Sequence, residues 1–334
     1  MQFGALAIAK PTFAILGAGA IGTIIGAHLA HAGHSVLMLA RGKRARQIEQ
    51  YGLRIKGLRA MSQPVTVLSN PSQFEGAEIL LVAVKARGTA AALEGIRHAD
   101  IDVAFSLQNG ISKDENMAAV WGAGRVLGAL ADTSGELLDD GEVLFTRNER
   151  LSLGELSGVL GARAQRIAKC INDAGVHASA VVNIHSLEWS KFAAWTGLMA
   201  LSIITRAPTW KYLIDANTAL LMTRLVREIA RLAAGCGIPL SDEAPLPVQS
   251  ISQHSEAEAI SLIQTVGERF RTTAPGHIMS SLQDLRAGRQ LELDETLGYA
   301  LRKADGLEIS LPVLAALYPL LVGIDAIECR SGSG

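Results

Sequence analysis

Residues 13–31 read FAILGAGAIGTIIGAHLAH, an apolar run followed by a glycine-rich turn and a second apolar stretch. The first run predicts a buried strand over Phe13–Leu16, and the second predicts a buried helix over Ile21–His31. Between them, residues 17–22 form a GxGxxG sequence. A strand, this glycine spacing and a helix in that order predict a βα unit that binds a dinucleotide.

Each glycine of this motif has a distinct expected role. Gly17 makes the tight turn, Gly19 lets the backbone approach a pyrophosphate, and Gly22 lets the helix pack closely on the sheet. The start of the helix, at Ala20 and Ile21, then faces the phosphates. Taken alone, the spacing also fits a glycine-rich packing motif. The strand before it and the helix after it favour cofactor binding.

The second predicted strand indicates which dinucleotide is bound. NAD-binding forms carry an acidic residue near its end, whereas a 2′-phosphate needs a cation there. Here residues 35–39 are followed by Ala-Arg-Gly-Lys-Arg, and the first acid is Glu49. NADP(H) is therefore favoured, with Arg41 as the main ligand of the 2′-phosphate and Lys43 or Arg44 assisting. Two alternatives stay open. The basic residues could be solvent-exposed side chains in the first turn of a helix with no ligand, or the cofactor could be NAD(H).

The first half of the chain predicts a doubly wound parallel sheet. Further buried strands are indicated by near-continuous apolar runs at 35–39, 79–84 and 103–107. Helical patterns follow at 44–51 and 89–96. Residues 125–155 are more polar and richer in Gly and Asp, which predicts shorter antiparallel strands that complete the sheet.

The strand pattern fades after about Val182. Apolar residues then recur at helical spacing in six stretches, at 187–204, 216–236, 256–269, 278–286, 295–304 and 313–322. The predicted fold class is therefore α/β. It has an N-terminal Rossmann-type domain at 1–182, an all-helical C-terminal domain at 183–330 and a tail at 331–334. We expect the domains to pack closely around a cleft.

Composition excludes several classes of function. The chain has 334 residues, with 31 Lys plus Arg against 32 Asp plus Glu, so no charge excess predicts binding to nucleic acid or to an anionic membrane. Cys170, Cys236 and Cys329 are far apart and form no metal-binding spacing. We therefore predict no metal site and a reducing compartment.

Two apolar stretches resemble membrane segments only superficially. Residues 11–40 contain no Lys, Arg, Asp or Glu, but glycines that include Gly17, Gly19, Gly22 and Gly26, together with three histidines, favour a buried strand, turn and helix. Residues 192–205 are too few to cross a bilayer. The first ten residues have no features of a signal peptide. These observations predict a soluble, cytoplasmic protein.

Two polar residues follow strands of the predicted sheet. Lys85 follows the strand at 79–84, and Asn109 follows the strand at 103–107 within Gln108-Asn109-Gly110. Both could be ordinary turn residues, since Asn-Gly is a common turn. Ligands of open α/β sheets bind at the carboxyl ends of the strands, beside the glycine turn. We therefore expect Lys85 and Asn109 to lie near the cofactor.

At these positions the chain resembles the ketopantoate reductase (2-dehydropantoate 2-reductase) family, over nearly its whole length. The resemblance rests on the glycine motif at 17–22 and on Val84-Lys85-Ala86, Gln108-Asn109-Gly110, Trp189-Ser190-Lys191 and the segment 280–294, SSLQDLRAGRQLELD. The last segment is the most specific, because its order and spacing are similar to the family's C-terminal signature.

The resemblance implies an NADPH-dependent reduction of a 2-oxo acid to a 2-hydroxy acid, a reaction of pantothenate biosynthesis. It implies that Lys191 donates the proton to the carbonyl oxygen, that Glu292 binds the substrate hydroxyl and that Ser280 binds the carboxylate. Asn109 and Lys85 match positions that line the family's cleft. An ammonium suits the developing alkoxide charge, and burial would bring its pKa toward the working range. Without the resemblance, a snorkelling lysine at the helix end is the simpler reading of Lys191.

One departure from the family pattern concerns the substrate. The family places asparagines four and eight residues after the catalytic lysine, on one helix face. Here those positions hold Trp195 and Met199. The expected substrate pocket is therefore smaller and drier, and the substrate is ketopantoate or a more apolar ketone.

The same departure leaves an alternative function open. A catalytically silent NADP-binding sensor or partner module would keep the glycine motif and lose turnover. For the enzyme, the expected partner is a small 2-oxo acid, and the chain is a possible homodimer.

Overall fold

The computed structural model describes residues 12–243 and 245–331. The chain divides into two compact units, Met1–Gln108 with Lys113–Ile184 and Asn109–Ser112 with His185–Gly334. This division lies two residues from the predicted boundary between 182 and 183. It also assigns the short segment that contains Asn109 to the second unit.

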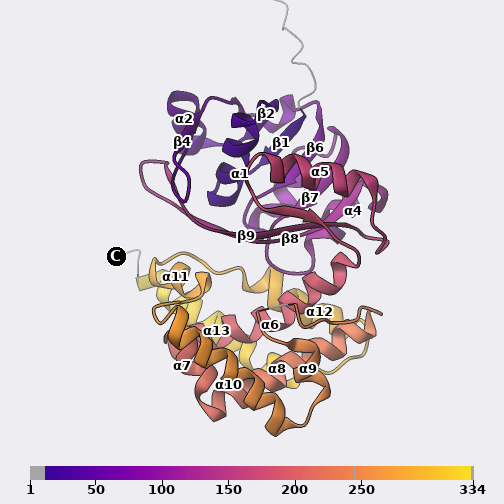
Figure 1. The fold of residues 1–334 in the computed structure, drawn as a ribbon, viewed down its shortest axis with the longest axis vertical. Helices are drawn as coiled ribbons and strands as arrows, with labels where there is room; N and C mark the ends of the chain where they lie inside the picture. The colour runs from indigo at the N-terminus through magenta and orange to yellow at the C-terminus, as the bar shows by residue number, and fades with distance from the viewer. Residues whose placement is uncertain (1–11, 244, 332–334) are drawn as a thin grey trace, which may run out of the picture. The chain divides into compact units, whose positions relative to one another are not determined.

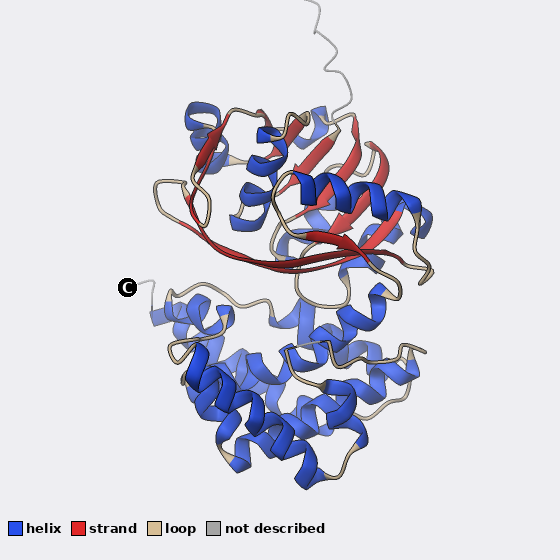
Figure 2. Cartoon of the chain, in the orientation of Figure 1, coloured by secondary structure: helices blue, strands red, loops and turns tan. Residues whose placement is uncertain are grey.

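The first unit is built on a 10-stranded sheet with the order β4-β3-β9-β8-β7-β6-β1-β2-β5, and β10 pairs with β9 (Figure 2). The strands are β1 Phe13–Leu16, β2 Val36–Leu39, β3 Leu53–Gly57, β4 Met61–Gln63, β5 Thr66–Leu68, β6 Gly76–Val82, β7 Asp100–Ser106, β8 Val126–Leu137, β9 Val143–Glu155 and β10 Ala178–Ala180. Strand β1 is parallel to both of its neighbours, β2 and β6. The strand order therefore reverses at β1, as in a doubly wound sheet.

Helices cover both faces of this sheet (Figure 1). They are α1 Ala20–His31, α2 Gly42–Tyr51, α3 Thr89–Glu94, α4 Lys113–Trp121 and α5 Ala162–Asp173. Phe13 and Ile15 of β1 pack in one core with α1, α2 and α5, whereas Ala14 and Leu16 pack in a second core with α3 and α4. Side chains that alternate between two apolar layers explain why the strand is apolar at every position.

The predicted α/β sheet is confirmed, with corrections in detail. Strands β8 and β9 are antiparallel as expected, but they have 12 and 13 residues and are the longest of the sheet rather than short. The polar, Gly-rich composition of these strands suggested that they would be interrupted. Instead, β8 and β9 stay paired along their length, with two shifts in register. Helices α4 and α5 were not predicted: α4 has almost no amphipathic pattern, whereas α5 is clearly amphipathic and lies in a stretch for which no element was predicted.

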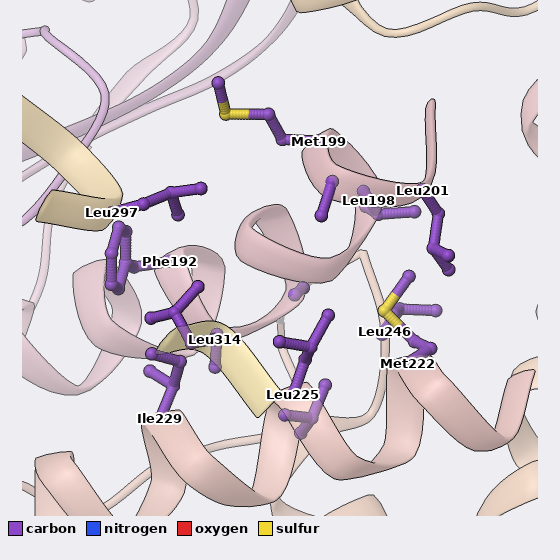
Figure 3. Packing of buried hydrophobic residues seen from close by; sticks show 14 of the residues in the cluster. Phe192, Leu198, Met199, Leu201, Met222, Leu225, Ile229, Leu246, Leu297 and Leu314 are labelled. Atoms are coloured by element: carbon purple, nitrogen blue, oxygen red, sulfur yellow. The ribbon is translucent and has the colours of Figure 1, made fainter. Parts of the chain in front are cut away.

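The second unit is helical, as predicted (Figure 1). Its helices are α6 Ile184–Thr205, α7 Thr209–Ile214, α8 Ala216–Gly235, α9 Val248–Gln253, α10 Glu256–Thr273, α11 Ser280–Arg286, a π-helix at Asp294–Gly298, α12 Tyr299–Asp305 and α13 Pro312–Ser331. Figure 3 shows side chains from α6, α8 and α13 meeting in its core, among them Phe192, Leu225 and Leu314. The helix predicted at 295–304 is present, with its first turn a π-helix that continues directly into α12.

Helix α13 is longer and more exposed than the sequence suggested. It includes Ser331, so the predicted tail at 331–334 begins inside a helix, and 332–334 lie outside the described residues. Its window Pro312–Cys329 is long and apolar enough to cross a membrane by length and composition, with 17% of that window buried. The helix begins at Pro312, and the carboxylate of Glu228 on α8 accepts hydrogen bonds from the N–H groups of Val313 at 2.8 Å and Leu314 at 2.9 Å.

Candidate cofactor and active site

A cavity of about 360 Å³ lies in the first unit, where the strand order reverses. Its lining comes from the ends of β1, β2 and β6 and includes Gly17, Gly19, Arg41, Arg44 and Lys85. The ends of β1 and β6 are held together by a hydrogen bond from the N–H of Ala83 to the oxygen of Leu16, 2.8 Å long. The structure thus brings the glycine motif, Arg41 and Lys85 around one cavity.

The three glycines of the motif meet different surroundings. Gly17 has φ +110°, and a Cβ there would lie 2.6 Å from the nitrogen of Val84. A Cβ on Gly22 would lie 2.1 Å from the oxygen of Gly17. A Cβ on Gly19 would instead have its nearest neighbour, the oxygen of Ala83, at 4.0 Å. The protein therefore requires Gly17 and Gly22 for its own packing, whereas the space beside Gly19 is open for a ligand.

The first turn of α1 has the properties of an anion-binding helix start. Gly19 is its N-cap residue, Ala20 and Ile21 are its first residues, and its first turn contains no acid. The unbonded N–H groups of such a turn and the helix dipole favour a phosphate. Together with the open space at Gly19, these features fit the pyrophosphate of a dinucleotide.

The basic residues after β2 differ in what they contact. Arg41 is the exposed N-cap residue of α2 and lines the cavity. Arg44 is half-buried, and its guanidinium donates hydrogen bonds to Ala18 O at 2.7 Å, Thr23 Oγ1 at 2.8 Å and Gly141 O at 2.7 Å. Burial lowers the pKa of Arg44. Lys43 donates to Asp139 O at 3.1 Å.

The structural roles of Arg44 and Gln108 are not apparent from the sequence. Arg44 connects the glycine turn to the β8–β9 hairpin, a contact that no local motif reveals. Gln108 Nε2 donates to Val84 O at 2.7 Å and also to Thr89 Oγ1, while its Oε1 accepts from Ser106 Oγ at 3.0 Å. Gln108 therefore connects the ends of β6 and β7 to α3. In the sequence, the one indication of such a role is that Gln108 precedes Asn109, a candidate site residue.

Lys191 is the eighth residue of α6 in the second unit, two turns inside the helix rather than at its end, and is half-buried. The preceding residues are buried, and Ser190 Oγ accepts a hydrogen bond from the N–H of Ser241 at 2.7 Å. One turn after Lys191, Trp195 stacks on Phe192 with 6.2 Å between ring centroids. A turn further, Met199 is 1% exposed and belongs to the core. Apolar side chains therefore occupy the helix positions that follow Lys191.

Glu292 and Ser280 lie at opposite ends of the signature segment. Ser280 is the exposed first residue of α11, with its side chain at the start of that helix. Glu292 is half-buried between Leu291 and Leu293, each 4% exposed. Its backbone oxygen accepts a hydrogen bond from Thr296 Oγ1 inside the π-helix. π-Helical turns are rare and are found frequently at functional sites, and here one begins two residues after Glu292.

The turn that contains Asn109 packs against the segment after Glu292. Ser112 Oγ donates to Glu295 O at 3.4 Å. Gly110 has φ +93°, and a Cβ there would lie 3.2 Å from Thr296 Cγ2. The structure thus brings Asn109 and the Glu292 segment, which are far apart in the sequence, into one part of the second unit. The meeting of Lys191, Ser280 and Glu292 around one substrate stays a prediction.

These features define a protein with a dinucleotide-binding sheet and a helical second domain. The sequence model described as "Ketopantoate reductase PanE/ApbA" matches residues 13–158, and "Ketopantoate reductase PanE/ApbA C terminal" matches residues 183–325. The chain therefore belongs to the ketopantoate reductase family, a family of nicotinamide-dependent oxidoreductases, which confirms the resemblance.

Individual relatives cover nearly the whole chain. A 2-dehydropantoate 2-reductase of Archaeoglobus fulgidus is 29% identical, over 93% of this chain and 97% of its own. A crystal structure of a PanE/ApbA family ketopantoate reductase from Ralstonia eutropha is 27% identical, with a TM-score of 0.79 over 95% and 99% of the two chains. D-mandelate dehydrogenase, solved with NADH and anilino(oxo)acetate, shares the fold at 20% identity, with a TM-score of 0.80 over 95% and 99%.

Proposed function

We propose that this protein reduces a 2-oxo acid to the 2-hydroxy acid with NADPH. The observation that carries the proposal is the cavity at the end of β1, where an open glycine turn, Arg41 and Lys85 surround space for a phosphate-bearing nucleotide. Gly17, Gly19 and the start of α1 hold the pyrophosphate, and Arg41 binds the 2′-phosphate. When bound, the nicotinamide supplies a hydride.

In the second unit, Lys191 donates a proton to the substrate carbonyl oxygen as that oxygen gains negative charge. Glu292 accepts a hydrogen bond from the hydroxyl group that results, Ser280 binds the carboxylate and Asn109 orients the acid. The family membership and the packing of the Asn109 turn on the Glu292 segment support these roles. Lys85 contributes to the cofactor side of the site.

The substrate class follows from α6. Trp195 provides half-buried apolar surface one turn after Lys191, and Met199, two turns after it, is buried in the core, so neither position carries an amide that would bind a hydroxylated acid. A buried amide partner rejects substrates that lack the matching polar group, whereas an apolar wall favours a bulkier or less polar substrate. The substrate is therefore ketopantoate or, more consistently with this helix, a more apolar 2-oxo acid.

A substrate panel tests the proposal. NADPH oxidation is measured with ketopantoate and with 2-oxo acids of increasing apolar size, for the parent and for Lys191→Ala. We expect turnover with at least one acid, a large loss in Lys191→Ala, and nearly unchanged NADPH binding by fluorescence titration. An equally active Lys191→Ala variant contradicts the proton-donor role. Tight NADPH binding without turnover on any acid favours the alternative of a silent NADP-binding sensor.

We also propose that the protein is cytoplasmic and that α13 pairs with α13 of a second copy. Between Pro312 and Cys329, the exposed residues of α13 are all apolar: Pro312, Ala315, Ala316, Pro319, Leu320, Val322, Ala326 and Ile327. In an antiparallel pair about a twofold axis, this face of each copy covers the same face of the other, and the two helix dipoles run in opposite directions. The bonds from Glu228 to the start of α13 favour a helix packed on its own unit over a membrane span.

Sedimentation velocity tests this pairing. We expect the parent chain to be a dimer at micromolar concentration and Ile327→Asp to be a folded monomer. A monomeric parent contradicts the pairing, as does an Ile327→Asp variant that stays dimeric.

A further inference from the structure

Asp325 of α13 contacts the segment that carries Glu292. Its side chain is buried, with 7% of the residue exposed, and its Oδ1 accepts a hydrogen bond from the backbone N–H of Leu291 at 3.1 Å. The thiol of Cys329 is a second donor, with Sγ 3.7 Å from the same oxygen. A buried carboxylate is costly unless it is hydrogen-bonded, so this contact restricts where the Leu291 backbone can lie.

A second contact holds the other end of the same segment. Tyr318, two turns before Asp325 on the same helix, donates a hydrogen bond from its hydroxyl to Asp294 Oδ1 at 3.3 Å. Arg302 of α12 donates to the same oxygen at 2.6 Å. A Cβ on Gly298 would lie 2.8 Å from both Asp294 Oδ1 and the Tyr318 oxygen. The hydrogen bond between Tyr318 and Asp294 therefore requires a glycine at position 298.

The two contacts lie on either side of Glu292. Asp325 holds Leu291, the residue before it, and Tyr318 holds Asp294, two residues after it. Leu291 and Leu293 are buried, whereas Glu292 between them remains half-exposed. The backbone that presents the Glu292 carboxylate is thus fixed at both ends by one face of α13, while the opposite face of the helix is apolar and exposed.

We infer that Asp325 is a positioning residue that sets the place of the Glu292 carboxylate for substrate binding, with Tyr318 as a weaker second support. This inference rests on the proposed function, because it assumes that Glu292 contacts the substrate. Its physical basis is that an error of about 1 Å in a positioned group can cost as much as about a hundredfold in rate. Asp325 itself contacts no substrate and acts through the backbone.

Four variants test the inference with the full chain: Asp325→Ala, Asp325→Asn, Glu292→Ala and the double variant Asp325→Ala with Glu292→Ala. An Asn side chain keeps an oxygen that can accept from Leu291, so Asp325→Asn should restore most of what Asp325→Ala loses. We expect Asp325→Ala to lower kcat/KM about tenfold or more with unchanged NADPH affinity. In the Glu292→Ala background the same change should have almost no further effect, because residues acting as a unit are not additive.

Hydrogen–deuterium exchange gives a readout that does not depend on activity. Exchange at the Leu291 amide and its neighbours should increase in Asp325→Ala and stay near parental in Asp325→Asn. Cys329→Ala is the matched control, since it removes the thiol contact and leaves the Leu291 bond. It should keep parental kcat/KM and exchange.

The outcomes separate the inference from the proposed function. If Glu292→Ala is as active as the parent, Glu292 has no role, and both the proposed site and this inference fall. If Glu292→Ala is impaired but Asp325→Ala is fully active, only the inference falls. It also falls if Asp325→Ala reduces activity by the same factor with and without Glu292, or if Asp325→Asn is no better than Asp325→Ala.

Discussion

The guanidinium of Arg44 donates a hydrogen bond to the carbonyl oxygen of Ala18, 2.7 Å away, inside the glycine turn. Its other nitrogens bond to Thr23 of α1 and to Gly141 in the β8–β9 hairpin. Arg44 therefore braces the glycine turn as well as lining the cavity, whereas Arg41 lines the cavity from an exposed position. Two cations three residues apart thus have separable roles.

Replacing Arg44 by Gln removes most of these bonds to the turn. We expect a lower melting temperature, because losing a charged, partly buried donor costs about 1–3 kcal/mol. We also expect weaker binding of NADPH and NADH by a similar factor, measured by fluorescence titration. A change in the preference between the two cofactors would instead show that Arg44 contacts the 2′-phosphate.

Replacing Arg41 by Asp should change cofactor preference and leave stability nearly unchanged. The carboxylate repels a 2′-phosphate and accepts hydrogen bonds from a ribose hydroxyl, so we expect the NADPH-to-NADH affinity ratio to fall about tenfold or more. Dissociation constants for both nucleotides measure this ratio. Equal binding of NADPH and NADH by the parent would contradict our reading of the residues after β2.

The glycines of the motif allow a matched comparison. A Cβ on Gly19 would have 4.0 Å of clearance, so Gly19→Ala should fold with a parental melting temperature but bind NADPH more weakly, because the methyl group enters the ligand space. A Cβ on Gly22 would lie 2.1 Å from the Gly17 oxygen, so Gly22→Ala should be destabilised by about 1–3 kcal/mol. The expectation fails if Gly19→Ala binds NADPH like the parent.

The buried His28 should make stability depend on pH. Its Nδ1 lies 2.8 Å from Ile24 O, its ring packs edge-on against Phe145, and burial lowers its pKa below the ordinary 6.5. Below that pH the unfolded chain therefore binds a proton that the folded chain does not. The free energy of unfolding should fall with decreasing pH, by at most about 1.4 kcal/mol per pH unit from this group.

Urea unfolding between pH 5 and 8 measures this dependence. His28→Gln should flatten the decline below pH 6.5, whereas His98→Gln, which changes an exposed side chain, should not. An unchanged pH profile in His28→Gln would rule out His28 as the cause.

Local sequence patterns predicted much of the first unit. The motif at 17–22 lies between β1 and α1, because an apolar strand, required glycines and an apolar helix are all local constraints. The long hairpin β8–β9 was predicted only in part, because its polar residues face solvent along strands that stay paired. The π-helix after Glu292 was not predictable, because its anchors Tyr318 and Arg302 lie in later helices.

The sequence by itself determined the order of strand and helix, the glycine turn, the absence of an acid after β2 and the family signature, because each depends on neighbouring residues. Only the tertiary structure decided that Arg44 braces the turn while Arg41 lines the cavity, that the Asn109 turn packs on the Glu292 segment, and that Asp325 holds Leu291. Those contacts join residues that are distant in the chain. Their partners are chosen by the packing of whole helices and strands, which no local pattern encodes.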